Sequence, residues 1–328
     1  MESARDKQPY VVGVDLGGTK ILAGVFDAKL ACVGRSRLST KPHRGAASVI
    51  ERIARSVRDA IDECDLDLRQ VQAIGVGAPG SVNPEKGEIV FSPNLPGWEN
   101  IPLQKALTKL LDRPVRVEND CNVCTLGVYH AELKAKPRHM VGIFLGTGVG
   151  GGLILDGKLF SGFNRTAGEI GHMVLEVGGA KCGCGNRGCF EALAGRAALF
   201  RRLASAVKDG RKTLLTDMLG PDLKNLRSGD LRKALKRGDK LVERIVEEAA
   251  EYTGIAVANV INLLNPEVVV LGGGLIQQLE EEMMAIIVET AQDYAMTGTW
   301  KGVEIVASEL GDDAGITGAA VLAQGALA

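Results

Sequence analysis

The sequence lacks two features that would assign it to a membrane or to a charged polymer. No apolar run in its 328 residues approaches the roughly 20 residues that a membrane-spanning helix needs. Lys and Arg number 39 against 40 Asp and Glu, which gives no electrostatic reason to expect nucleic acid or an anionic membrane as partner. The polar start, residues 1–10, has the pattern of neither a secretory signal nor a transit peptide. We therefore expect a cytoplasmic protein with no nucleic-acid and no membrane partner.

Cysteine is also scarce, yet three of the seven cysteines lie within residues 182–189. In a reducing compartment such clusters are more often metal-binding or catalytic than disulfide-bonded. His172, Cys182, Cys184 and Cys189 give the pattern H-x9-C-x-C-x4-C, a Cys₃His set that closes a tetrahedral zinc site. The sequence therefore predicts a structural Zn²⁺ with no open position for water. The alternative is a loop with free thiols.

Hydrophobic periodicity indicates an α/β protein, and the length favours about two domains. Two glycine-centred β-hairpins are predicted, at residues 10–30 and 139–159. Helical spacing predicts helices at residues 46–63 and at about 240–264, the second of which ends before Pro266. Buried strands are predicted within residues 71–80, 113–122 and 267–276.

The two hairpins resemble each other. A shift of 129 residues aligns residues 12–30 with 141–159 and gives seven identities in nineteen positions. This favours an internal duplication over the chance likeness of two glycine-rich hairpins. The copies differ at their turns, since Asp15 corresponds to Phe144 and Thr19 to Gly148. If the duplication is real, two α/β domains flank a cleft, which is a common position for a ligand.

Three glycine turns could hold phosphate, although none has the spacing of a Walker P-loop or a dinucleotide fingerprint. Glycines let backbone N–H groups approach phosphate oxygens closely, and Asp15 could hold Mg²⁺ through water. Plain β-turns are the alternative. The predicted nucleotide-binding residues are Asp15, Gly17, Gly18, Thr19 and Lys20, then Gly146, Thr147 and Gly148, then Gly273 and Gly274.

Asp120, in "VENDCN", follows a predicted strand and is the candidate general base. A helix cap at this position explains the residue equally well. Cys121 and Cys124 form a CxxC pair beside it. We interpret these cysteines as small apolar residues at a helix start rather than as a redox pair.

The chain resembles the ROK family of sugar kinases and repressors, in the actin-like ATPase superfamily. The resemblance covers nearly the whole chain, through "DLGGTK", "GAPG", "SPNLPGWENIP", "ENDCN", "GTGVGGG", "GEIGH", "CGCGNRGCFE", "LGGG" and "LGDDAGITGAA". It implies a two-domain α/β fold of the actin-like (ribonuclease H-like) kind, in which each domain has a mixed five-stranded sheet. The expected domains are residues 1–118 with 310–328, and residues 119–309, and ATP would bind in the cleft.

The resemblance also implies an ATP-dependent kinase that phosphorylates a hexose at its 6-hydroxyl, with Asp120 as base. Glucose is the first choice, because the "SPNLPGWEN" loop is similar to that of bacterial glucokinases in the family. The implied sugar ligands are Gly80, Asn94, Asn119, Asp120, Glu169, His172 and Glu191. His172 would present one ring nitrogen to zinc and the other to the sugar.

Other functions remain open at this point. Within the family, N-acetylmannosamine, N-acetylglucosamine and fructose kinases are alternatives, and polyphosphate could replace ATP as donor. A sugar-responsive repressor is disfavoured, because nine residues before the first predicted strand are too few for a DNA-binding domain. A sugar-binding protein without catalysis is a third possibility. Family likeness also implies a homo-oligomer, a dimer or tetramer.

Overall fold

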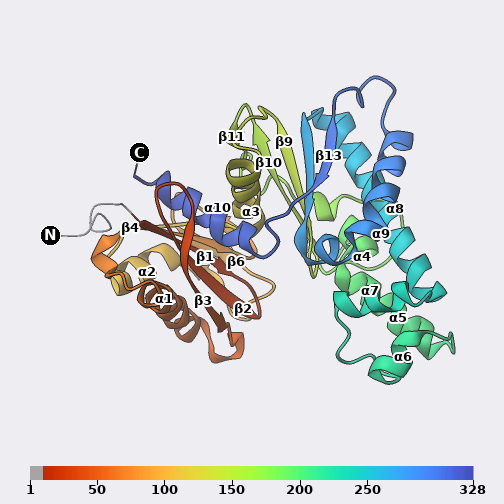
Figure 1. Ribbon diagram of the computed structural model, residues 1–328, viewed down its shortest axis with the longest axis horizontal. Coiled ribbons are helices and arrows are strands. Elements are labelled where there is room, and N and C mark those ends of the chain that lie inside the picture. Colours follow the sequence, from red (N-terminus) through yellow and green to blue (C-terminus); the bar gives the residue numbers. More distant parts are fainter. Residues whose placement is uncertain (1–9, 328) are drawn as a thin grey trace. The chain divides into compact units, whose positions relative to one another are not determined.

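A computed structural model describes residues 10–327 of the chain, which divides into two compact units (Figure 1). Unit 1 comprises Met1–Arg138, Gly152–Ala167 and Asp312–Ala328, and unit 2 comprises His139–Gly151 and Gly168–Gly311. Residues 1–9, most of the polar start in which no targeting signal is predicted, lie outside the described residues. Within the described part of the chain, no helix combines the length and the apolar character needed to cross a membrane.

Unit 1 is built on a five-stranded mixed sheet. Its strand order is β3-β2-β1-β4-β8, in which β1 pairs antiparallel with β2 and parallel with β4. The strands are β1 Tyr10–Leu16, β2 Lys20–Phe26, β3 Cys32–Ser39, β4 Val71–Ala78 and β8 Val115–Asn119. The predicted first hairpin is therefore confirmed, as are the strands expected after it.

Helices cover both faces of this sheet (Figure 1). The apolar side chains of α1 (Ala46–Glu63) and α2 (Leu103–Leu111) share one core with Val12, Val14 and other residues of the sheet. On the opposite face, α10 (Asp313–Gln324) packs against β1 and β4. Glycine makes this close approach possible, because a Cβ on Gly13 would lie 1.8 Å from the Ile316 carbonyl oxygen. The C-terminal helix thus belongs to unit 1.

Smaller elements complete unit 1. A three-stranded sheet, which the sequence did not predict, has the order β5-β6-β7. Its strands are β5 Ser81–Asn83, β6 Glu88–Phe91 and β7 Glu99–Ile101. The remaining elements of unit 1 are α3 Asp120–Gly127, a π-helical turn at Val128–Glu132 and 3₁₀ turns at Pro42–Arg44 and Leu68–Gln70.

The second five-stranded sheet has the order β11-β10-β9-β12-β13. Its strands are β9 Met140–Leu145, β10 Val149–Leu155, β11 Lys158–Leu159, β12 Val268–Gly272 and β13 Glu304–Ala307. Strand β12 pairs parallel with both β9 and β13. Position by position this is the order of the first sheet, with β9 in the place of β1 and β12 in the place of β4. The structure therefore supports the duplication, and the predicted mixed five-stranded sheets are confirmed.

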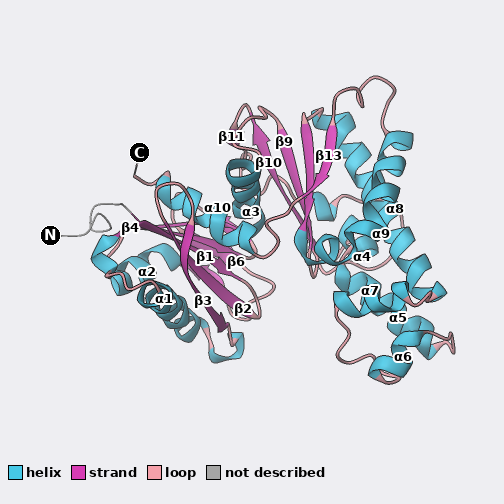
Figure 2. Ribbon diagram, in the orientation of Figure 1, coloured by secondary structure: helices cyan, strands magenta, loops and turns pink. Residues whose placement is uncertain are grey.

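Most of the remaining chain of unit 2 is helical (Figure 2). The helices are α4 Phe190–Ala194, α5 Arg196–Lys208, α6 Leu214–Leu219, α7 Ser228–Lys236, α8 Lys240–Leu264 and α9 Gly273–Tyr294, with a 3₁₀ turn at Ile170–His172. Asn265 ends α8 in the left-handed conformation, directly before Pro266, where the sequence predicted the stop. The expected domain boundaries, 1–118 with 310–328 and 119–309, stay a prediction. Helix α3, which follows the expected boundary at residue 118, lies in unit 1 of the structure.

Candidate functional site

The first glycine turn joins β1 to β2 in unit 1. Gly17 N–H donates to the Lys20 carbonyl oxygen at 2.8 Å, and the Thr40 hydroxyl donates to the Gly17 carbonyl oxygen at 2.7 Å. The predicted phosphate ligand Lys20 forms an ion pair with Asp312, with Nζ and Oδ2 2.6 Å apart. Asp312 lies in the closing motif "LGDDAG", and the sequence analysis assigned it no function.

Asp15 stands at the end of β1, on the face that packs against α10. A Cβ on Gly315 of α10 would lie 2.9 Å from the Asp15 Cγ, so a small residue is needed there. Burial, and secondly the negative charge of Asp120, raise the pKa of Asp15 to about 7, although Lys20 opposes the shift. The carboxyl group predicted to hold Mg²⁺ and the one predicted to act as general base thus interact electrostatically within unit 1. Such perturbed carboxyls are typical of functional sites and of cation-binding sites.

Asp120 begins α3, but it is not the residue that caps the helix. Asn119 is the N-cap, and its Oδ1 accepts from the N–H groups of Cys121 at 2.9 Å and Asn122 at 3.1 Å. The Nδ2 of Asn119 donates to the Gly80 carbonyl oxygen at 3.0 Å. The capping alternative for Asp120 is therefore excluded as its main explanation, although its Oδ1 also lies 2.9 Å from the Cys121 nitrogen.

Glu118 is a residue that the sequence analysis missed. Its side chain is buried, and Oε1 accepts from the Asn119 N–H at 2.8 Å and from Asn122 Nδ2 at 3.1 Å. Burial raises the pKa of this carboxyl, and the two hydrogen bonds oppose the shift. Glu118 thus bonds to the residue before Asp120, Asn119, and to a residue after it, Asn122, and so fixes the first turn of α3. A glutamate within a strand of valines was the available signal.

Cys124, the second cysteine of the CxxC pair, does not have the environment of a reactive thiol. Burial, together with the charges of Asp15 and Asp120, raises the pKa of Cys124 well above its ordinary value. A thiol with a raised pKa is a poor nucleophile. The interpretation of Cys124 as a small packing residue agrees with this.

The predicted sugar loop lies beside the first turn. Gly80 has φ of +99°, and a Cβ there would lie 2.3 Å from the Phe91 carbonyl oxygen. Asn94 is exposed, and its backbone oxygen would lie 3.3 Å from a Cβ on Gly18. Trp98 is fully buried and anchors the loop to the core.

The second glycine turn, in unit 2, joins β9 to β10. Its backbone is bonded to the start of α5, since Arg196 N–H donates to the Gly146 oxygen at 3.2 Å and Ala197 N–H to the Thr147 oxygen at 3.0 Å. Arg196 Nη2 also donates to the Thr147 hydroxyl at 2.6 Å. Arg196 was not predicted from the sequence. The third turn differs from expectation, because Gly273 and Gly274 form the first residues of the long helix α9 rather than a separate turn.

The predicted zinc ligands come together in unit 2. The donor atoms of His172, Cys182, Cys184 and Cys189 all lie within 4.8 Å of one another. Cys184 Sγ and Cys189 Sγ are 3.7 Å apart, and so are Cys182 Sγ and His172 Nδ1. Zn–S bonds of about 2.3 Å in a tetrahedron place two sulfurs about 3.8 Å apart, so the observed edges fit this metal.

The three thiols have different environments. Burial raises the pKa of Cys182 to about 12. The Asn186 backbone N–H lowers the pKa of Cys184 below its ordinary value. A bound cation would favour the thiolate at all three positions, because metal ligation requires deprotonated sulfur.

The three predicted sugar ligands of unit 2 surround this cluster. His172 Nε2, the nitrogen that does not face Cys182, lies 3.8 Å from Glu169 Oε2, which is longer than a hydrogen bond. Both side chains are accessible. Glu191 instead makes a hydrogen bond within the protein, because its Oε2 accepts from the Val149 N–H at 3.0 Å.

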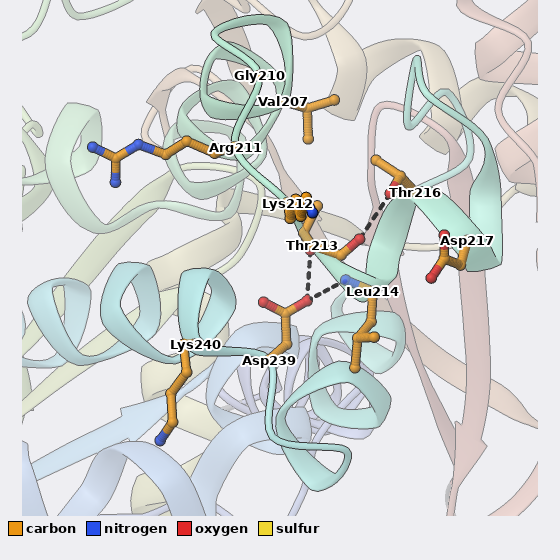
Figure 3. A pocket seen from close by; sticks show the side chains of 10 residues that line it. All are labelled: Val207, Gly210, Arg211, Lys212, Thr213, Leu214, Thr216, Asp217, Asp239 and Lys240. Atoms are coloured by element: carbon orange, nitrogen blue, oxygen red, sulfur yellow. Dashed lines mark hydrogen bonds between the residues drawn. The ribbon is translucent and has the colours of Figure 1, made fainter.

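A separate cavity of about 550 Å³ opens among α5, α6 and the start of α8. Asp239 is its central polar group, and the carboxylate accepts from the Thr213 hydroxyl at 2.6 Å and from the Leu214 N–H at 2.7 Å (Figure 3). Arg211 and Lys240 point away from this carboxylate in Figure 3. None of the predicted site residues lines this cavity, and its central carboxylate is satisfied by the protein itself.

Comparison with known proteins gives consistent results. A sequence profile described as the ROK family matches residues 11–326. A glucokinase from Thermotoga maritima is 35% identical over 310 residues, covering 94% of this chain and 96% of that protein. An N-acetyl-D-glucosamine kinase from Vibrio cholerae is 36% identical over 324 residues, covering 94% and 98%. A crystal structure of a ROK family glucokinase from Streptomyces griseus, in complex with glucose and AMPPNP, matches with a TM-score of 0.85 at 30% identity, covering 96% of this chain and 99% of that chain.

Proposed function

Because the chain belongs to the ROK family, we propose that it transfers the γ-phosphoryl group of ATP to the 6-hydroxyl of glucose. The observation that carries this proposal is Asp120, held at the first turn of α3 by Asn119 and Glu118 and interacting with the carboxyl of Asp15. The similarity to glucokinases over nearly the whole chain supports it.

In this mechanism Asp120 is the general base. Phosphoryl transfer passes through a loose transition state, so positioning and charge stabilisation matter more than a strong base. The Asp120 carboxylate orients the 6-hydroxyl and accepts its proton as the oxygen attacks the γ-phosphorus. An ordinary carboxylate suffices because it accepts the proton late.

Asp15 is the proposed partner of Mg²⁺. A dication near Asp15 would offset the burial and, secondly, the repulsion from Asp120 that raise the pKa of Asp15. When bound, Mg²⁺ neutralises charge on the β- and γ-phosphates. The proposed phosphate contacts are residues of the two glycine turns and of the α9 N-terminus: Gly17, Gly18, Thr19, Lys20, Gly146, Thr147, Gly148, Gly273 and Gly274.

The proposed sugar ligands are Gly80, Asn94 and Asn119 of unit 1, and Glu169, His172 and Glu191 of unit 2. The 3.8 Å separation of His172 Nε2 from Glu169 Oε2 supports this, since one sugar hydroxyl can bond to both atoms. The Cys₃His cluster is proposed to bind a structural Zn²⁺ that fixes His172 and the start of α4.

A second candidate is an N-acetylglucosamine kinase, favoured by the 36% identity to the Vibrio enzyme. Coupled ADP detection with a panel of hexoses, N-acetylhexosamines and fructose separates the two. Glucose should give the highest kcat/KM. Turnover of N-acetylglucosamine without turnover of glucose would exclude the glucokinase assignment, and no turnover of any sugar would exclude a kinase. A cytoplasmic homo-oligomer stays a prediction.

A further inference from the structure

Glu191 occupies the space between the metal cluster and the second glycine turn. It lies two residues after Cys189, which is both a predicted metal ligand and the N-cap of α4. Its Oε1 is 3.7 Å from Cys182 Sγ, and its Oε2 accepts from the Val149 N–H at 3.0 Å. One carboxylate therefore contacts a cluster thiol with one oxygen and the turn with the other.

Gly148 is shaped to receive this carboxylate. A Cβ on Gly148 would lie 2.0 Å from Glu191 Oε2, so any larger residue would displace the side chain. No left-handed backbone is involved, because φ of Gly148 is not positive. The equivalent residue of the first hairpin is Thr19. The glycine of the second copy thus has a specific packing cause, because a side chain at this position would occupy the place of the Glu191 carboxylate.

The rest of the turn is bonded to the same short segment. After α4, the N–H groups of Arg196 and Ala197 donate to Gly146 and Thr147. One stretch of chain, residues 189–197, therefore contains the cluster ligand Cys189, then Glu191, and then the two residues whose N–H groups bond to the turn. A displacement of α4 at Cys189 changes the position of the backbone N–H groups that we propose to bind phosphate.

We propose that Glu191 is a positioning residue that couples metal binding at the Cys₃His cluster to nucleotide binding at the Gly146–Gly148 turn. This rests on the proposed kinase function and goes beyond the use of Glu191 as a sugar ligand. Since coupling between two sites is reciprocal, metal raises nucleotide affinity by the factor by which nucleotide raises metal affinity.

The test measures binding of a fluorescent ADP analogue with Mg²⁺, in the absence of sugar, so that sugar contacts of Glu191 do not contribute. Zinc-loaded wild-type protein is compared with protein depleted by 1,10-phenanthroline. Depletion should weaken nucleotide binding by about tenfold, within the usual range of coupling energies. In Glu191→Ala binding should already be weak and should not respond to depletion. Glu191→Gln, whose amide oxygen can still accept from Val149, should retain the response.

A double-mutant cycle tests the same contact without removing metal. Gly148→Ala should weaken binding by about tenfold in the zinc-loaded protein, because its Cβ displaces the carboxylate. In the Glu191→Ala background the same change should have little further effect. Additive effects of the two substitutions, or equal sensitivity of wild type and Glu191→Ala to depletion, would overturn the coupling. Absence of nucleotide binding by zinc-loaded wild type would overturn the kinase function and the coupling together.

Discussion

The turn between β1 and β2 is held by the Thr40 hydroxyl and carries a lysine paired with Asp312, whereas the turn between β9 and β10 is held by Glu191 and Arg196. The two turns occupy equivalent positions in sheets of the same strand order. Where the first has Asp15, the second has Phe144, which is buried against Gly272. One turn thus follows a strand with a buried carboxyl, and the other is bonded to Glu191, which lies beside the cysteine–histidine cluster.

The largest effect in this comparison is expected from Asp15→Asn. The folded-state pKa of Asp15 is raised to about 7, so stability contributed by its protonated form is present below its unfolded value near 3.8 and is lost as pH rises through 7. In metal-free protein with EDTA, the variant should gain up to about 4 kcal/mol of unfolding free energy relative to wild type between pH 4 and pH 8. Urea unfolding at several pH values measures this. A difference between the two proteins that does not change with pH would contradict the raised pKa.

Gly13→Ala should strongly destabilise unit 1. The new Cβ would lie 1.8 Å from the Ile316 oxygen of α10, and this atom is backbone that cannot rotate away. Overpacking of this kind costs about 3 kcal/mol, measurable by chemical unfolding. An unchanged unfolding midpoint would show that α10 does not pack closely on β1.

Cys184→Ser should release the metal and weaken sugar binding. Cys184 is exposed, so the serine removes a ligand without a large packing change. We expect loss of bound zinc by elemental analysis, a lower melting temperature and a KM for sugar raised by about tenfold. Cys32→Ser, in unit 1 and remote in sequence from the cluster, is the control and should keep its zinc. Full zinc content in Cys184→Ser would remove this cysteine from the ligand set.

The smallest effect is a difference in stability between alanine substitutions at the first glycine of each turn, Gly17 and Gly146. A Cβ on Gly17 would lie 3.1 Å from the Lys20 oxygen, whereas a Cβ on the equivalent Gly146 would meet nothing within 4 Å. Gly17→Ala should therefore cost about 1 kcal/mol of stability, and Gly146→Ala should cost less. Equal losses in thermal unfolding would mean that the two turns are packed alike.

Much of this arrangement was predictable from the sequence, because local patterns determine it. The helix predicted at residues 46–63 is observed as Ala46–Glu63, since its apolar residues recur at helical spacing. The Cys₃His cluster was predictable because its ligands are close in sequence. The identical strand order of the two sheets agrees with the seven identities between the hairpins.

What could not be predicted depends on contacts between distant residues. Glu191 and Val149 are 42 positions apart, and Lys20 and Asp312 are nearly the whole chain apart, so no spacing rule connects them. The position of Glu118 after the valines of its strand was the one signal of a buried carboxylate, but its hydrogen bond to Asn122 Nδ2 depends on how β8 meets α3. The capping function of Asn119, rather than Asp120, depends on the position of the last residue of β8, and element ends are hard to define from sequence.

The most direct test of the account is the turnover of glucose by Asp120→Asn, with zinc content and glucose binding measured on the same sample. The substitution keeps the shape of the side chain and removes the proton acceptor. We expect kcat to fall by about 10³-fold, while zinc stoichiometry and glucose affinity stay close to those of wild type. A kcat near the wild-type value would contradict the assignment of Asp120 as the base.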